Sequence, residues 1–467
     1  MKEQLDIFTE ETIQEISNSV IAELGIGKTE ALKIPLARWK GKVIAVGGNA
    51  IQAMLPGAIQ GQICSVCSEA EGEGRIHDEE IIAEVTAVNG NRVVLQPYIS
   101  SLTGISGKHY IQPLQDRLSL LAGDYLKGSV VDGIGRVLFA SKENAKYIGS
   151  AKNFAVDRDP PNALTRPIID AHMSVGVRCI DTLLMLGRGQ RVGIFAPAGV
   201  GKSTLLGMIT RFADADVVVL GLIGERGREV NEFLEMVLGE EARKKAIVVV
   251  STSDRPAIEK IKAIYTATSI AEYFRDEGKD VLLLVDSITR FARAQRDVAV
   301  ASGEFIPTSG FPASVFAELP RLLERTGQSS KGSITALYTI LVDNEKANDV
   351  IAEEVRSILD GHIILSRKMA SSNHYPAIDS LASISRVMAQ IATEEQIMLA
   401  GKTRNLLSKY EEIQLLVRVG EFRKGEDSEA DEALLRHSDL INFLKQKVED
   451  YTSMDDSFDR LREALNE

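Results

Sequence analysis

The segment FAPAGVGKSTLL at 195–206 constrains the fold of this chain more than any other feature. The apolar run Val192–Phe195 before it is typical of a strand, and a helical stretch begins near Lys202. Phosphate binding requires backbone N–H groups that point into one concavity, and Gly199 and Gly201 allow the chain to curl in that way. A strand, a glycine-rich loop and a helix in this order predict a nucleotide-binding P-loop.

Each residue type in this loop has an expected task. Lys202 would reach the β- and γ-phosphates of a nucleotide, and the hydroxyl of Ser203 would ligate Mg²⁺. The usual pattern begins with a glycine where this chain has Ala196, and a methyl group fits there if φ stays negative. We expect the P-loop residues that bind nucleotide to be Ala198, Gly199, Val200, Gly201, Lys202, Ser203 and Thr204.

The hydrophobic pattern divides the chain into regions of different structure. From about Leu36 to Pro113, short alternating segments punctuated by Gly and Asn predict a small β-barrel. After an irregular connector at 141–168, strand-like apolar runs alternate with helical stretches, which predicts a mostly parallel sheet with helices on both faces. Beyond about Glu394 the chain is charged and helical. We therefore expect a helical extension at 1–28, a barrel at 29–113, an α/β domain at 114–393 and a helical domain at 394–467.

Two carboxylates that follow strand-like runs are candidates for the chemistry. Asp286 ends the run LLLVD, where a carboxylate at the C-terminal edge of a strand can hold Mg²⁺ through water. Glu225 ends VVLGLIGE, one βα unit after the P-loop, at the edge where ligands bind in open α/β sheets. Hydrolysis requires a base or a polarising group for the attacking water, and the position of Glu225 favours that role.

Two arginines at the far end of the α/β region leave two interpretations open. Arg367 and Arg386 both follow strand-like runs. A surface ion pair is the usual role of such a residue. Either one is also placed to act as an arginine finger, which reaches the γ-phosphate bound by a neighbouring subunit.

Composition argues against several classes of function. The net charge of −12 opposes a duplex nucleic-acid partner, which requires a basic surface. The N-terminus lacks the apolar core of a secretory signal, and the longest apolar runs are only strand-sized. Three cysteines fit a reducing compartment, and Cys64 and Cys67 are interpreted as small residues of a strand. We therefore expect a cytoplasmic protein with no nucleic-acid partner.

Seven segments follow one another in an order that matches a known family. They are APAGVGKSTLL, LIGERGREVNEF, ATSIAEYFRDEGKDVLLLVDSITRFARAQRD, LPRLLERTG, GSITALYTILV, SILDGHIILSRK and HYPAIDSLASISRVM. Together they resemble the export ATPases of type III secretion systems, both injectisome and flagellar, a group that is itself similar to the catalytic β subunit of rotary ATP synthases. The resemblance is most specific over Arg178–Met388 and weak in the first 30 residues.

The resemblance implies catalytic roles for particular residues. The catalytic glutamate of the family falls on Glu225, with Arg226 beside it near the γ-phosphate. The aspartate associated with Mg²⁺ falls on Asp286, and Lys202 is the lysine of the P-loop. The arginine finger falls on Arg386, because it belongs to the segment SISRV.

The resemblance also implies an adenine pocket and a fold. Tyr375 in HYPAID matches the aromatic residue that packs against adenine, and Phe422 in GEFRKG would cover the other face. The implied fold is of the α/β class, with a small N-terminal β-barrel, a RecA-like P-loop core and a C-terminal α-helical domain.

The function implied by the resemblance is hydrolysis of ATP, with Mg²⁺, at the subunit interfaces of a homohexameric ring. The ring would lie at the inner face of the bacterial inner membrane, associated with it through the apparatus. Its partners would be a stator-like regulator, a central stalk protein and chaperone–effector complexes, and its task would be to unfold export substrates or release them from chaperones. A rotary or vacuolar-type ATP synthase subunit and a ring-shaped RNA translocase stay open as alternatives. The segment SSKGSITALYT favours the secretion group, and within it the injectisome branch.

Overall fold

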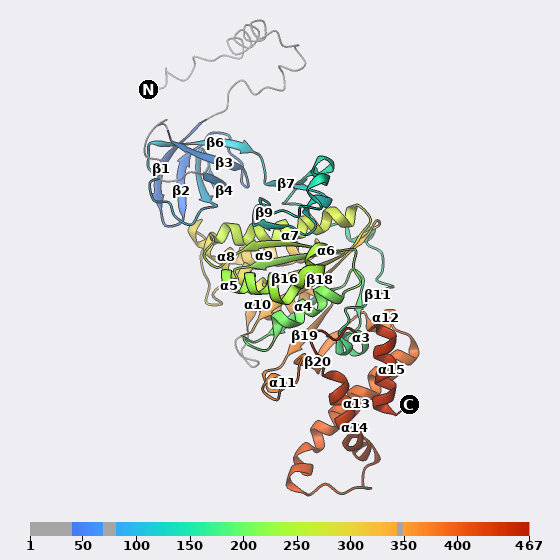
Figure 1. The fold of residues 1–467 in the computed structure, drawn as a ribbon. Coiled ribbons are helices and arrows are strands. Elements are labelled where there is room, and N and C mark those ends of the chain that lie inside the picture. The colour runs from blue at the N-terminus through green and yellow to red at the C-terminus, as the bar shows by residue number, and fades with distance from the viewer. Residues whose placement is uncertain (1–39, 69–80, 343–348, 467) are drawn as a thin grey trace, which may run out of the picture. The chain divides into compact units, whose positions relative to one another are not determined.

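The computed structural model describes residues 40–68, 81–342 and 349–466, so the helical extension expected at 1–28 lies outside the described residues. The chain forms two compact units. The first unit consists of the chain up to Gln96 together with Leu102–Asp116. The second unit consists of Pro97–Ser101 and all residues from Arg117 onward. Figure 1 traces the chain through both units by colour.

The first unit is a closed β-barrel. Its strands pair in the order β1–β2–β5–β4–β3–β6, and β1 closes the barrel by pairing with β6 in antiparallel fashion. Alternate residues point inward, so that Ile51 and Ala53 in β2 are fully buried. The strands are β1 (Gly41–Gly47), β2 (Ala50–Met54), β3 (Ile63–Ser68), β4 (Ile81–Asn89), β5 (Arg92–Pro97) and β6 (His109–Gln115). The predicted barrel is confirmed, and Cys64 and Cys67 lie on β3 as strand residues.

The second unit is built on a sheet with a parallel centre and antiparallel edges. The strand order is β20–β19–β13–β18–β16–β14–β15–β8–β9, and the strands from β19 to β8 are parallel. All residues of β14 are buried, because helices cover both faces of the sheet. The strands are β8 (Val130–Asp132), β9 (Val137–Phe139), β13 (Arg191–Ala196), β14 (Val217–Ile223), β15 (Ala246–Ser251), β16 (Asp280–Asp286), β18 (Ser333–Leu341), β19 (Gly361–Leu365) and β20 (Ile378–Ser385), with the two-residue β17 (Gly327–Gln328) paired to β18.

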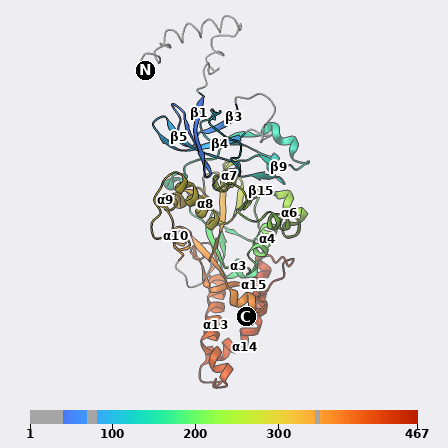
Figure 2. The ribbon, with the colours of Figure 1, turned by 90° about the vertical axis from the view of Figure 1, so that its left-hand side faces the viewer.

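Helices form a layer on each side of this sheet. Figure 2 shows α8, α9 and α10 on one side and α4 and α6 on the other. Between α5 and α6 the helix widens into a π-helical turn at Phe233–Leu238. The helices of this region are α3 (Arg178–Leu183), α4 (Lys202–Phe212), α5 (Gly227–Glu232), α6 (Gly239–Lys245), α7 (Ala257–Asp276), α8 (Ile288–Ala301), α9 (Ala313–Leu323), α10 (Val350–Ile358), α11 (Arg367–Ser371) and α12 (Met388–Ile391).

The C-terminal helices share their apolar core with the α/β region. They are α13 (Glu394–Val419), α14 (Ser428–Leu444) and α15 (Met454–Leu465). One buried cluster continues from the sheet through Ile180 in α3 to Leu440 in α14 and Leu461 in α15. The predicted fold class, an α/β core with a barrel before it and helices after it, is therefore confirmed. None of the described helices combines the length and apolar character that crossing a bilayer requires.

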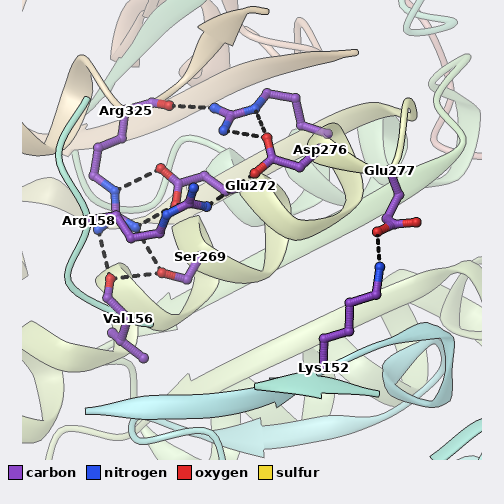
Figure 3. A network of polar contacts seen from close by, with 9 residues as sticks. Lys152, Val156, Arg158, Ser269, Glu272, Asp276, Glu277 and Arg325 are labelled. Atoms are coloured by element: carbon purple, nitrogen blue, oxygen red, sulfur yellow. Dashed lines mark hydrogen bonds and ion pairs between the residues drawn. The ribbon is translucent and has the colours of Figure 1, made fainter. Parts of the chain in front are cut away.

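A fully buried arginine anchors the connector to the core, as Figure 3 shows. Arg325, shortly after α9, donates to both carboxylate oxygens of Glu272 in α7 at 3.0 and 2.8 Å, and to the backbone carbonyl of Val156 at 3.0 Å. The hydroxyl of Ser269 accepts from Arg325 and donates to the same carbonyl, both at 2.8 Å. Arg158 adds a second positive charge 3.5 Å from Glu272. A buried carboxylate is tolerated here because every nearby charge is paired.

Candidate nucleotide site

The P-loop (residues 196–204) has the conformation that phosphate binding requires. Ala196 is the last residue of β13 and keeps the extended conformation of a strand, which is compatible with its methyl group. Gly199 and Gly201 have φ angles of 80° and 84°, a region in which a residue with a Cβ atom is strained. At Gly201 a Cβ atom would also lie 3.3 Å from the ring of Tyr375. The two glycines are therefore required by backbone conformation and, at Gly201, by a close aromatic neighbour.

The helix after the loop offers unpaired backbone donors. Its first i→i−4 hydrogen bond runs from the N–H of Leu205 to the carbonyl of Gly201, at 3.0 Å. The N–H groups of Lys202, Ser203 and Thr204 precede that bond, so they are free of intrahelical partners and lie at the positive end of the helix dipole. The side chains of Ser203 and Thr204 are exposed, and in the loop Ala198 and Gly199 are exposed whereas Val200 is buried. This end of α4 is built to receive an anion.

The first residue of α4 and one residue from each of two strands converge behind the loop. Lys202 forms an ion pair with Asp286, the last residue of β16. The hydroxyl of Thr339 in β18 donates to the same carboxylate oxygen at 2.7 Å. Because β18 lies between β13 and β16, these side chains meet at one edge of the sheet. The structure thus brings the predicted Lys202 and Asp286 together and adds Thr339, a buried hydroxyl that needs a partner.

Glu225 lies two residues beyond β14 and faces an arginine that the sequence analysis did not identify. Only 14% of its side chain is exposed, and an Nη atom of Arg290 in α8 lies 3.9 Å from its carboxylate. Burial, with the negative charge of Asp286 as a second cause, raises the pKa of Glu225 to about 7, against the opposing effect of Lys202 and Arg290. A carboxyl group with a pKa near 7 is suited to exchange a proton with water. Arg290 lies in the motif SITRFARAQRD, where only its position in space reveals the contact.

The predicted arginines lie on the surface. The side chain of Arg226 is largely exposed and pairs with Glu229 at 3.1 Å. Arg386 follows the edge strand β20 and is exposed, with its backbone N–H bound to the carbonyl of Asp360 at 3.0 Å. Its guanidinium forms no ion pair or hydrogen bond with any residue that the structure describes. Arg367, the other candidate, is exposed at the start of α11.

The two predicted aromatic residues come from different parts of the chain: Tyr375 precedes β20, and Phe422 lies between α13 and α14. Tyr375, 40% exposed, has its ring beside Gly201 and its carbonyl bound by the N–H of Gln446 at 2.9 Å. Gln446 follows the C-terminal end of α14, whereas Phe422 lies in the turn before its N-terminal end. The role of Phe422 at the second face of the adenine pocket stays a prediction.

Two family models match the chain. The ATP synthase alpha/beta family, nucleotide-binding domain, matches residues 176–385, which include the P-loop, Glu225, Asp286 and Tyr375. The C-terminal domain of the T3SS EscN ATPase matches residues 392–463, which include α13 and α14 and most of α15.

Similar proteins extend the match to nearly the whole chain. The SPI-2 type 3 secretion system ATPase of Salmonella typhimurium is 43% identical over 92% of this chain and 95% of its own length. The flagellum-specific ATP synthase of Bacillus subtilis is 44% identical over 89% of this chain and 93% of its own. Among solved structures, the assembled ATPase EscN from the type III secretion system of enteropathogenic E. coli has a TM-score of 0.82 at 45% identity, covering 91% of this chain and all of that one. EscN has also been solved in complex with its central stalk EscO, with a TM-score of 0.81 at 44% identity over 91% of this chain and all of that one.

Proposed function

This chain belongs to the family of type 3 secretion system ATPases and their flagellar relatives, and from that premise we propose how it hydrolyses ATP to drive protein export. The observation that carries the proposal is the meeting of Lys202, Asp286 and Glu225 beside a P-loop with free N–H groups. These residues supply a positive charge for phosphate, a buried carboxylate and a carboxyl group with a pKa near 7. Together they are the parts that phosphoryl transfer to water requires.

The proposed roles follow from the geometry. The N–H groups at the start of α4 bind the phosphates, and the ammonium of Lys202 leaves Asp286 to contact the β- and γ-phosphates. The hydroxyl of Ser203 and the carboxylate of Asp286 are hard oxygen donors of the kind that Mg²⁺ prefers, and they would hold the ion that neutralises charge on the phosphates. Glu225 orients the attacking water and accepts its proton. Tyr375 packs against adenine, with its ring already beside Gly201.

The site is completed by a second subunit. We propose a homohexameric ring in which Arg386 reaches the γ-phosphate held by its neighbour, because its guanidinium has no partner among the described residues of its own chain. The assembled state of EscN and its complex with a central stalk support a ring and a stalk partner here. A stator-like regulator and chaperone–effector complexes are further proposed partners, at the inner face of the bacterial inner membrane. Arg226, now paired with Glu229, would turn toward the γ-phosphate on binding.

The relatives that match nearly the whole chain count against the rotary-synthase alternative. The synthase model matches only residues 176–385, whereas proteins named for type 3 secretion or the flagellum match about nine-tenths of the chain. The RNA-translocase alternative rests on no observation in the structure, and RNA-stimulated hydrolysis would be needed to restore it.

ATPase activity of the purified chain with Mg²⁺, measured against protein concentration and without partners, tests the proposal. Specific activity is expected to rise steeply with concentration, because sites completed in trans require assembly. The Arg386→Ala variant should stay low at every concentration, and adding it to a Lys202→Ala variant should restore part of the activity. Negligible activity of the unaltered chain throughout would indicate a missing partner subunit and favour the rotary-synthase alternative.

A further inference from the structure

Gln446 joins the C-terminal helices to the residue beside the P-loop. It lies two residues after α14, is buried, and donates its backbone N–H to the carbonyl of Tyr375 at 2.9 Å. Its side-chain oxygen accepts from the N–H of Arg178, and its side-chain nitrogen donates to the carbonyl of Gly176, both at 2.8 Å. The same nitrogen donates to the carbonyl of Asp450 at 2.5 Å. The side chain thus fixes the position from which the backbone N–H holds Tyr375.

Arg178, the first residue of α3, secures the same stretch of chain. It is only 5% exposed, and its guanidinium donates to groups on both sides of Gln446. These groups are the carbonyl of Phe443 at 2.8 Å, the carbonyl of Lys445, the carboxylate of Asp450 at 3.0 Å and the hydroxyl of Thr452 at 3.3 Å. The segment 443–452 therefore cannot shift against α3 without breaking several buried hydrogen bonds, each costly to leave unmade.

The backbone on either side of Tyr375 is anchored within the α/β region: the N–H of His374 donates to the carbonyl of Met369 at 3.0 Å, and the carbonyl of Ala377 accepts from the N–H of Ser366 at 2.9 Å. Tyr375 follows a turn in which Asn373 has a φ angle of 56°, and its ring is 40% exposed. The neighbouring His374 is buried, and burial together with the charge of Lys445 lowers its pKa to about 4, so it stays neutral at physiological pH. Among the residues that the structure describes, the hydrogen bond from the N–H of Gln446 is the polar link between Tyr375 and the segment after α14.

We propose that Gln446 is a positioning residue for nucleotide binding, which holds Tyr375 at the P-loop and couples it to the C-terminal helices. A displacement of α14 and α15 that carries α3 with it then moves the carbonyl of Tyr375 and changes nucleotide affinity. By thermodynamic reciprocity, bound nucleotide also changes the energy of that displacement. The inference rests on the proposed contact of Tyr375 with adenine and goes beyond it, because it assigns a role to a residue that does not touch the nucleotide.

The test compares Gln446→Met with the unaltered full-length chain. Methionine keeps the length of the side chain and removes its three hydrogen bonds. We measure the Kd of a fluorescent ADP analogue, and KM and kcat for ATP with Mg²⁺. The expected result is a Kd and a KM raised at least about fivefold with kcat within about twofold, because a coupling of this kind changes binding rather than chemistry. An unchanged Kd would overturn the inference.

Three further variants separate the possible outcomes. Arg211→Met is the matched control, because Arg211 donates to the carbonyl of Val448 in the same segment at 2.8 Å without touching Tyr375, and its Kd should stay within about twofold. Asp450→Asn weakens the ion pair with Arg178 and should raise the Kd by a smaller factor. This variant is used in place of Gln446→Met if Gln446→Met does not fold. Tyr375→Ala tests the premise. If Tyr375→Ala binds nucleotide normally, the proposed adenine contact is wrong. If Tyr375→Ala binds weakly and Gln446→Met binds normally, only the role of Gln446 is refuted.

Discussion

The guanidinium of Arg290 lies 3.9 Å from the carboxylate of Glu225, at the edge of the sheet where Lys202 and Asp286 also meet. A positive charge at this distance opposes the effect of burial, so Glu225 is held near the point at which it gains or loses a proton. Two positive and two negative groups thus surround the place where water would attack. Their balance makes the site sensitive to single substitutions.

Glu225→Gln should abolish turnover and leave nucleotide binding intact. The amide keeps the size of the side chain but cannot accept a proton, so kcat should fall by about 10²–10⁴-fold. The Kd of a fluorescent ADP analogue should change by less than about threefold. Near-normal turnover would remove Glu225 from the role of base.

Arg290→Met should move the acid limb of the pH profile of kcat/KM toward higher pH. Loss of the positive charge raises the pKa of Glu225 further above its ordinary value, so the ionised form that can act as base appears only at higher pH. The exposed Arg293, on the same helix, provides the control, and Arg293→Met should leave the limb in place. A shift of equal size in both variants would mean that net charge, not contact, sets the pKa.

Thr339→Val should raise the Mg²⁺ concentration required for half-maximal activity. Valine has nearly the same shape but cannot donate to Asp286, and loss of a hydrogen bond to a charged group costs about 1.5–3 kcal/mol. Thr335→Val is the matched control. Thr335 is equally buried on β18, but its hydroxyl accepts from the N–H of Gly189, away from the site. The control should lose stability without changing the Mg²⁺ requirement.

Arg325→Met should destabilise the α/β unit more than any surface substitution. Removal of this fully buried partner leaves the carboxylate of Glu272 without its main counter-charge, at a cost of about 3–5 kcal/mol. The double variant Arg325→Met, Glu272→Met should recover part of the loss, because no unpaired charge remains. Urea unfolding of the unaltered chain and the two variants measures this, and a double variant no more stable than the single one would count against the ion pair.

The residues along the chain were enough to place the P-loop. Lys202 and Asp286 are far apart in sequence, yet a strand–loop–helix unit and a carboxylate at a strand end both belong to the same edge of a parallel sheet. Thr339 could not be found in this way. Its contact with Asp286 depends on β18 lying between β13 and β16. The order of strands across a sheet cannot be deduced from their order along the chain.

The C-terminal part shows a second limit of the sequence. Periodicity identifies helices and their apolar faces, but it does not say which end of a helical hairpin approaches the core. The contact of Gln446, just after α14, with Tyr375 is of this kind and appears only in the structure. Arg325 shows the same limit, because its motif matched the family while its partners, Glu272 and Val156, come from distant segments.

The ion pair between Lys202 and Asp286 has a consequence for the choice of ligand. Each group satisfies the other, so an arriving ligand competes with an ion pair inside the protein. An anion that binds without a cation pairs with the ammonium of Lys202 and leaves the buried carboxylate of Asp286 without a counter-charge. A phosphate chain that arrives with its own divalent cation offers a replacement to both groups at once. The ion pair thus discriminates against bare anions by the cost of separating its own two charges.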